Sequence, residues 1–282
     1  MRKSTATALS FIIVIALGAV GVIAWHDTFT VAITTVEVPV PGLTRAVRIL
    51  HASDLHGVTF GHAQSAIAAK LQGQRFDAAV INGDHIPTVN AEPTPVLELL
   101  AVLQDHAPVV FVTRGNHDTS AVLDALAEHG AVIVERGDDA VPLPTDAGRI
   151  VVTPAIDPGE VPADAELTLA LGHYPMTTSA ITTATRGHTG VSLFLFGHAH
   201  GGQIRLPFVG ALWAPGEIGS DGHVVSRTSP STLFPELRGR TISGLDRVGA
   251  AYRHISNGIG TQAVRLRFLA PAEITVITLA PK

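Results

Sequence analysis

The stretch VRILHASDLH (residues 47–56) indicates how this chain folds, because a short apolar run in it ends abruptly in Asp54 and His56. Runs of this length without polar interruption are typical of strands buried on both faces of a sheet. The same arrangement follows four more times: AAVIN (78–82) into Gly83-Asp84-His85, VVFVT (109–113) into Arg114-Gly115-Asn116-His117-Asp118, LTLALG (167–172) into His173, and VSLFLF (191–196) into Gly197-His198-Ala199-His200.

Helical patterns separate the first three runs. Residues 63–74, 94–106 and 119–129 have apolar residues at helical spacing, and Gly130 is suited to end the last of them. A strand–helix–strand order predicts an α/β fold with parallel strands. Ligands of such sheets bind outside the carboxyl ends of the strands. We therefore expect the five polar clusters, although distant in sequence, to lie together at one edge.

Three further segments carry weaker signals. Residues 28–43 alternate β-branched residues with prolines, which predicts a strand. Residues 263–269 and 273–279, on either side of Pro271, predict a hairpin of two strands. The Gly- and Ser-rich stretch 219–244 is interpreted either as a lid over a site or as a tolerated surface loop.

The N-terminal run ALSFIIVIALGAVGVIAW (8–25) has no charged residue and follows Arg2 and Lys3. A run of about 18 apolar residues is long enough to span a bilayer, and the preceding positive charges predict that the N-terminus stays in the cytoplasm. A cleaved signal sequence and a buried core helix are the alternatives. We expect residues 1–27 to be a membrane anchor or signal segment and residues 28–282 to be one exported domain, single-pass anchored at the cell membrane or secreted after cleavage.

Composition narrows the possible chemistry. The chain has no cysteine, which excludes disulfides, thiolate metal sites and cysteine nucleophiles, whereas its 14 histidines favour imidazole ligands. A net charge of −5 gives no basic surface for nucleic acid, so no nucleic-acid partner is expected. Bound metal ions would dominate the local field, so a phosphorylated substrate stays compatible with this charge.

The ordered set Asp54-x-His56, Gly83-Asp84, Gly115-Asn116-His117-Asp118, His173 and Gly197-His198-x-His200 resembles the signature blocks of calcineurin-like metallophosphoesterases, over about residues 51–200. Residues 201–207 and 256–260 look like a bacterial, often membrane-linked branch of that family. The resemblance implies a four-layer α-β-β-α sandwich of two mixed sheets, with a metal site at the carboxyl ends of the strands. It also implies two divalent metal ions, chosen from Mn, Zn, Fe and Mg.

The resemblance also implies roles for individual residues. Asp84 would bridge the two ions, and His117 would stabilise the phosphoryl group and protonate the leaving oxygen, oriented by Asp118. The first ion would be held by Asp54, His56 and His200, and the second by Asn116, His173 and His198.

Four histidines outside these blocks, His51, His62, His85 and His254, are interpreted as structural, since a lone histidine is usually a satisfied hydrogen-bonding group. A supporting role behind the ligands stays open for His51. His85 departs from the family pattern, which has an aliphatic residue after the bridging Asp, so it could alter access to the site.

The predicted function is hydrolysis of a phosphomonoester or phosphodiester by a hydroxide activated between two metal ions, on the extracytoplasmic side of the membrane. Expected substrates are a phosphorylated small molecule or a phosphate derived from lipid or cell wall. The alternatives are a non-catalytic binding or scaffold protein on the same fold, and a metal-dependent nuclease. The complete ligand set favours an enzyme, and the acidic charge balance disfavours a nuclease.

Overall fold

The first of two six-stranded sheets contains the strands predicted around residues 47–113. The structure is a computed structural model, and it describes residues 2–214, 232–262 and 264–282. Strands β2 to β5 of this sheet run parallel, whereas β16 is antiparallel to β2 and parallel to β1, so the sheet is mixed. Its order is β1 (Val31–Val40), β16 (Ala272–Pro281), β2 (Val47–Ser53), β3 (Ala78–Asn82), β4 (Val110–Thr113) and β5 (Val132–Ile133).

The second sheet is also mixed. Its four central strands are parallel, and the two outer strands pair antiparallel with their neighbours. The order is β14 (Gly244–Val248), β15 (Ala251–Ile255), β9 (Val191–Phe196), β8 (Leu167–Leu171), β7 (Ile150–Pro154) and β6 (Val141–Pro142). The fold is therefore α/β with two mixed sheets, as the sequence predicted.

Apolar side chains join the two sheets. Ile49 and Phe111 of the first sheet belong to the same buried cluster as Leu169 and Leu193 of the second. A separate cluster packs the other face of the first sheet against three helices, and a third joins the second sheet to one helix. These helices are α2 (Ser65–Leu71), α3 (Thr94–Gln104) and α4 (Ser120–Glu128) on the first sheet, and α5 (Thr178–Ala184) on the second.

The predicted helices form close to their predicted bounds for local reasons. The Thr119 hydroxyl accepts a hydrogen bond from the Val122 amide and caps α4, and Pro95 lies in the first turn of α3. The stretch expected to be helical from residue 63 starts instead with a 3₁₀ turn, η1 (His62–Gln64), because Gln64 is left-handed and its buried side chain bonds the backbone of Val58 and Phe60. The predicted strand at 28–43 is confirmed as β1.

The predicted hairpin at 263–279 is wrong. Only the second half forms a strand, and β16 lies between β1 and β2 rather than against residues 264–269, which contain no more than a single bridge from Phe268 to Ile204. The alternation Val-x-Leu-x-Phe suggested apolar residues facing inward. Instead Arg267 is fully buried while Val264 and Leu266 face outward. The inward and outward faces of this segment are therefore the reverse of those predicted.

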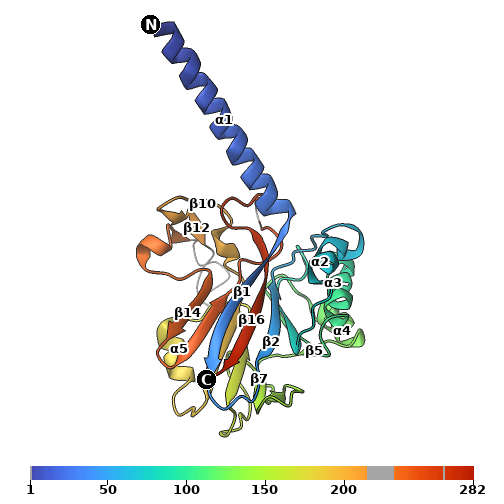
Figure 1. Cartoon of the computed structure of the whole chain (residues 1–282). Helices are drawn as coiled ribbons and strands as arrows, with labels where there is room; N and C mark the ends of the chain where they lie inside the picture. The colour runs from blue at the N-terminus through green and yellow to red at the C-terminus, as the bar shows by residue number, and fades with distance from the viewer. Residues whose placement is uncertain (1, 215–231, 263) are drawn as a thin grey trace.

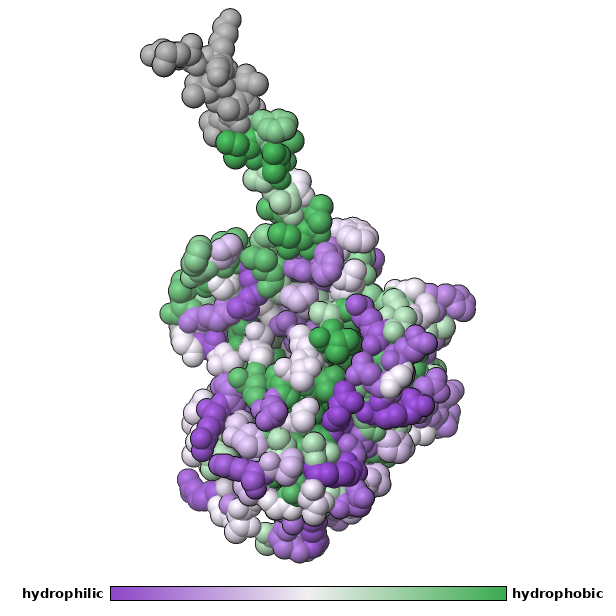
Figure 2. Space-filling view, viewed as in Figure 1, coloured by the Kyte–Doolittle hydropathy of each residue, from purple (hydrophilic) through white to green (hydrophobic). Residues whose placement is uncertain are grey.

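Helix α1 (Arg2–Phe29) projects from one end of the domain, opposite the C-terminus (Figure 1). Its segment Ser10–Phe29 is long and apolar enough to be a membrane span or a signal sequence, and only 17% of the most apolar stretch is buried, which excludes a buried core helix. Apolar surface covers the coloured part of this helix and continues onto the adjoining end of the domain (Figure 2).

Short elements follow β9 in the chain, and two of them, β10 and β12, lie near the base of α1 (Figure 1). These short elements are η2 (His200–Gly202), β10 (Arg205–Leu206), β11 (Gly210–Ala211), β12 (Trp213–Ala214), β13 (Thr232–Leu233) and η3 (Glu236–Arg238). Of the stretch 219–244, interpreted above as lid or loop, residues 219–231 lie outside the described part of the chain.

Candidate metal centre

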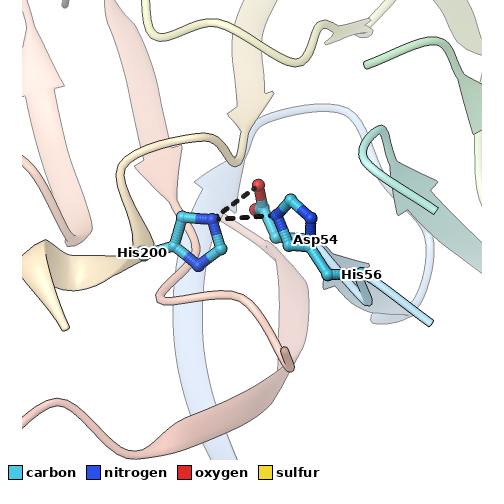
Figure 3. A group of neighbouring side chains, drawn as sticks. All are labelled: Asp54, His56 and His200. Carbon is cyan, nitrogen blue, oxygen red and sulfur yellow. Dashed lines mark hydrogen bonds and ion pairs between the residues drawn. The ribbon is translucent and has the colours of Figure 1, made fainter. Parts of the chain in front are cut away.

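Five loops that leave the strands bring the predicted polar clusters together. Asp54 follows β2 directly, and the other clusters follow β3, β4, β8 and β9 within three residues. Three of these side chains, Asp54, His56 and His200, lie beside one another (Figure 3). His200 is 144 residues from His56 in the sequence. The five loops thus form one site from residues spread over half the chain.

The backbone of these loops is held in an uncommon conformation. Asp54, His56, Asp84, His198 and His200 all have positive φ, between 47° and 65°. Left-handed backbone is unfavourable for residues other than glycine, and such strain concentrates where a side chain must be aimed at a ligand. Five strained residues in one cluster indicate a site held by the surrounding fold.

The first group of donor atoms consists of Asp54, His56 and His200. The Nε2 atom of His200 lies 3.6 Å from Asp54 Oδ1 and 3.1 Å from His56 Nε2. The backbone amide of His198 donates to both Asp54 carboxylate oxygens at 3.0 Å and fixes that side chain. All three side chains are buried.

The second group forms around Asp84 and His173. Asp84 Oδ2 lies 3.3 Å from His173 Nε2, which in turn is 3.2 Å from both His198 Nδ1 and Asn116 Oδ1. The same Asp84 oxygen is 3.6 Å from His56 Nε2, in the first group. Asp84 therefore lies between the two groups, which is the position that a bridging ligand needs.

Glycines let the loops approach this closely. A Cβ atom on Gly115 would overlap the backbone and carboxylate of Asp84, and one on Gly197 would overlap the carboxylate of Asp54. No other residue type has the room, so the glycines that accompany the acidic and histidine residues in sequence are required by packing.

Burial keeps most of these imidazoles neutral. Loss of solvation lowers the pKa of His56 to about 4 and of His198 to about 3, and it holds the pKa of His200 well below the usual value. Burial also raises the pKa of Asp54 to about 6. A neutral imidazole has the free lone pair with which histidine binds a metal ion.

The pKa values of His173 and Asp84 shift in the directions that favour their charged forms. Burial acts to lower the pKa of His173, but the charges of Asp84 and Asp54 outweigh it and raise that pKa to about 9. Burial likewise acts to raise the pKa of Asp84, but His173 and its other neighbours hold it below its ordinary value. Two buried carboxylates thus demand positive charge at this point, and a divalent cation would supply it.

The residues present fit a metal ion. Buried Asp84 Oδ2 accepts no hydrogen bond from the described residues, so its lone pairs face the histidines unused. The side chains form three groups, and within each group the ligand atoms lie within 4.8 Å of one another. The groups are Asp54-His56-His200, His56-Asp84-His117 and Asp84-His173-His198. Imidazole, carboxylate and amide donors form the set that suits divalent ions such as Mn²⁺, Fe²⁺ and Zn²⁺.

His117 is positioned differently from the ligand candidates. Its side chain is about a quarter exposed, its Nδ1 lies 2.8 Å from the Pro87 carbonyl oxygen, and its Nε2 lies 3.1 Å from the Gln262 amide nitrogen. The ring borders a cavity of about 510 Å³ whose other walls include Val58 and Phe29. His117 is therefore the member of the cluster that faces open space.

The resemblance implied that Asp118 orients the His117 ring, but its carboxylate contacts other groups. Its carboxylate accepts hydrogen bonds from the backbone amides of Gly115 at 2.7 Å and His85 at 2.8 Å, and the buried His85 ring lies 3.7 Å from it. The Pro87 carbonyl holds His117 instead. Asp118 ties the loop after β4 to the loop after β3, and His85 packs behind this tie.

Three residues of the site were missed by the sequence analysis: Gln262, Arg265 and Arg267. Gln262 and Arg265 line the cavity beside His117. Buried Arg267 donates to the carbonyls of Asn257, Gly258 and Gly260, and the Gly260 amide donates to the Asp54 carbonyl. The alternation of Arg265 and Arg267 with apolar residues was the available signal, but it suggested a strand.

The histidines left out of the ligand set lie apart from it. His51 Nδ1 is 3.0 Å from His254 Nδ1, and the two rings form a buried pair between the sheets' adjoining strands β2 and β15. His62 is exposed at the start of η1. The structural interpretation therefore fits these three residues.

A model of the calcineurin-like phosphoesterase family matches residues 47–202, which include all five loops that carry the candidate metal ligands. The chain is 34% identical over 91 residues to the uncharacterized metallophosphoesterase YkuE of Bacillus subtilis (strain 168), covering 32% of this chain and 24% of that protein's length. It is 24% identical over 248 residues to the phosphodiesterase YaeI of Escherichia coli (strain K12), covering 82% of each chain.

Proposed function

The chain belongs to the calcineurin-like phosphoesterase family, and we propose that it hydrolyses a phosphomonoester or phosphodiester with two divalent metal ions bound in the site described above. The observation that carries the proposal is the position of Asp84, whose Oδ2 lies within 3.6 Å of a histidine from each donor group. A carboxylate between two sets of buried imidazoles fits two ions that share one ligand. Such a pair of ions supplies an activated water and a clamp on the phosphoryl oxygens.

The ligands of each ion follow from the two donor groups. Asp84 belongs to both sets. The first ion would be bound by Asp54, His56 and His200, and the second by Asn116, His173 and His198. The amide of Asn116 binds metal without adding negative charge next to an anionic phosphate.

His117 is the proposed general acid. Its Nδ1 is fixed on the Pro87 carbonyl and therefore carries a proton, while Nε2 lies 3.1 Å from the side-chain amide of Gln262, which lines the same cavity as His117. Protonated at Nε2, the ring donates that proton to the leaving oxygen and compensates negative charge on the phosphoryl group. Asp118, in this account, holds the loop that presents Asn116 and His117.

The cavity beside His117 supports an amphiphilic substrate. It extends from His56 and His117 to Thr28 and Phe29, the last residues of α1, and it combines the apolar Val58 with Arg265. A phosphate at the metal site would therefore leave room for an apolar group directed toward α1. We propose a phosphoester derived from lipid or cell wall, and the name of the relative YaeI favours a diester.

We propose that α1 anchors the chain and that the catalytic domain, residues 28–282, lies on the extracytoplasmic side. Support comes from the apolar segment Ser10–Phe29 and from the basic residues before it in the sequence. A reporter that is active only in the cytoplasm, fused after Lys282, is expected to stay inactive. Activity of this fusion would contradict the proposed orientation.

We further propose that the domain is a four-layer α-β-β-α sandwich with the metal site at the carboxyl ends of the strands. The three apolar clusters support this arrangement, because one lies between the sheets and one on the outer side of each. The positions of Asp54, Asp84 and His198 directly beyond β2, β3 and β9 support the location of the site.

Hydrolysis of generic aryl phosphomonoesters and phosphodiesters tests the proposed reaction. The full chain in detergent would be assayed with Mn²⁺, Zn²⁺, Fe²⁺ or Mg²⁺, beside Asp84→Ala and the exposed control Asp146→Ala. We expect metal-dependent turnover that Asp84→Ala abolishes and Asp146→Ala preserves. Absence of turnover with every metal, or turnover unchanged by Asp84→Ala, would contradict the proposal.

A further inference from the structure

An exposed apolar surface surrounds the base of α1. It is called the apolar rim here and consists of outward-facing side chains of four segments, namely the last turn of α1, the loop 264–269, the turn after β10 and the turn after β13. Soluble surfaces rarely gather large apolar side chains in one place, and such patches usually contact another apolar phase. The rim comprises Phe29, Phe208, Phe234, Val264, Leu266 and Leu269.

Hydrogen bonds fix the loop 264–269 against α1. The Arg267 amide donates to the Thr28 hydroxyl at 2.8 Å, and the Leu269 amide donates to the Asp27 carboxylate at 2.7 Å. The outward-facing Val264 and Leu266 are therefore held level with the last turn of α1. Their exposed fractions, 48% and 39%, show that the domain does not cover them.

The β10–β11 hairpin extends the rim. It is attached to the same loop, because the Arg205 amide donates to the Phe268 carbonyl and the Phe268 amide to the Gln203 carbonyl. Phe208 at the turn of this hairpin is fully exposed and has a φ of 65°, which is unfavourable for a bulky residue. β10 and β12 lie beside the base of α1, and the space-filling view shows apolar surface there (Figures 1 and 2).

The level of the rim along α1 identifies its partner. Trp25 and Phe29, whose ring centroids are 6.3 Å apart, are exposed at the end of the apolar segment Ser10–Phe29. Aromatic residues are enriched where a membrane span meets water, and apolar side chains can bury about 5–10 Å into that boundary. Arg265, exposed between Val264 and Leu266, adds a cation suited to anionic headgroups.

We propose that the apolar rim lies in the surface of the same bilayer that α1 enters, as a second membrane contact of the domain. The rim is continuous with α1, and it borders the cavity of the metal site at Phe29 and Arg265. The domain is thereby held with this cavity facing the lipid surface. The inference rests on the proposed membrane anchoring by α1, concerns the orientation of the domain, and does not depend on the proposed hydrolysis.

Single-cysteine labelling tests this contact, because the chain has no native cysteine. The full chain would be reconstituted in phosphatidylcholine–phosphatidylglycerol vesicles with an environment-sensitive fluorophore on Phe208→Cys, Leu266→Cys or Val264→Cys. Val14→Cys reports on α1 itself. Lys282→Cys is the matched control, since the C-terminus lies at the opposite end of the domain (Figure 1).

We expect the labels at 208, 264 and 266 to emit at shorter wavelength than the label at 282. We also expect lipids with a nitroxide near the headgroup to quench them and not the label at 282. Labels at the rim that emit and are quenched like the one at 282 would overturn the proposal, whatever the label at 14 shows. A wavelength shift that depends on protein density, without quenching by nitroxide lipid, would assign the rim to a second copy of the chain and overturn the bilayer contact.

Phe208→Ser separates this inference from catalysis. Phe208 is fully exposed and lies outside the lining of the cavity at the metal site. We therefore expect the Phe208→Ser variant to hydrolyse a soluble aryl ester as fast as the unmodified chain does. Its activity should fall only toward an ester presented in vesicles. Equal activity on both substrates would contradict a role of the rim in presenting the site to the membrane.

Discussion

The Nδ1 atom of His117 lies 2.8 Å from the carbonyl oxygen of Pro87, so the loop after β3 holds the ring that the loop after β4 carries. Because a carbonyl only accepts hydrogen bonds, this contact places a proton on Nδ1 and leaves Nε2 to the Gln262 side chain and the cavity that both residues line. The arrangement supports the proton-transfer role proposed for His117, with the proposed metal ligands arranged behind it.

Replacing His117 by alanine tests that role. We expect turnover to fall by about 10²–10⁴-fold, because a positioned general acid typically contributes that much. Metal content, measured by mass spectrometry on the purified protein, should stay unchanged. Gln262→Ala, which removes a side chain that contacts only the Nε2 side of the ring, is expected to have a smaller effect. Loss of metal in His117→Ala would make His117 a ligand instead.

Asp118→Ala distinguishes the two roles considered for this carboxylate. Its hydrogen bonds to the Gly115 and His85 amides position the loop that carries Asn116. We therefore expect metal affinity to fall by about 10–100-fold, as for other groups that hold ligands in place. Titration with Mn²⁺ followed by isothermal calorimetry measures this change. Unchanged affinity with reduced turnover would instead support direct action on His117.

Arg267→Met should destabilise the fold. The buried guanidinium donates to several backbone carbonyls of residues 257–260, and a buried acceptor left unsatisfied costs about 1–3 kcal/mol. We expect the free energy of unfolding to fall by about 3 kcal/mol or more in urea denaturation. Arg265→Met, at an exposed position in the same loop, should change it by no more than about 0.5 kcal/mol. Equal effects of the two substitutions would contradict this role of Arg267.

The buried pair His51–His254 predicts a pH dependence of stability. Burial lowers the pKa of His254 to about 4, and burial together with the charge of His254 lowers the pKa of His51 well below its ordinary value. In the unfolded chain both pKa values return to about 6.5. Between about pH 6.5 and 4 the unfolded chain therefore binds more protons than the folded one, and stability falls as the pH is lowered through this range.

His254→Leu removes one of the two histidines that take up a proton when the chain unfolds in this pH range. Urea unfolding of the chelator-treated protein between about pH 7.5 and 5 should show a shallower loss of stability for this variant, by about one proton. Chelation matters because metal release would otherwise add to the slope. His62→Leu, at an exposed position, is the control and should keep the original slope. Identical slopes for His254→Leu and the unmodified chain would contradict the interpretation.

The sequence predicted the part of the fold that local patterns determine. The apolar runs before Asp54, Asp84 and His173 form buried strands, because an uninterrupted run can only be covered on both faces. Helix bounds followed from caps such as Thr119. The convergence of the site residues was also predictable, since parallel strands deliver their following loops to one edge.

Long-range pairing and inverted burial escaped the sequence analysis. β16 lies between β1 and β2, which precede it by more than 200 residues in the sequence. Such a pairing depends on long-range side-chain packing rather than on a local pattern. The loop 264–269 buries Arg267 and exposes Leu266, because carbonyls of residues 257–260 satisfy the guanidinium there. The contacts of Asp118 were not predictable either, since adjacency in sequence to His117 did not indicate that its carboxylate would accept hydrogen bonds from the Gly115 and His85 amides.

Anomalous X-ray diffraction from crystals of the full chain grown with Mn²⁺ or Zn²⁺ tests the metal centre most directly. The account predicts two anomalous peaks about 3.5–4 Å apart, one on each side of the Asp84 carboxylate. Asp54, His56 and His200 should surround one peak, and Asn116, His173 and His198 the other. A site without any peak, or with peaks ligated by other residues, would contradict the account.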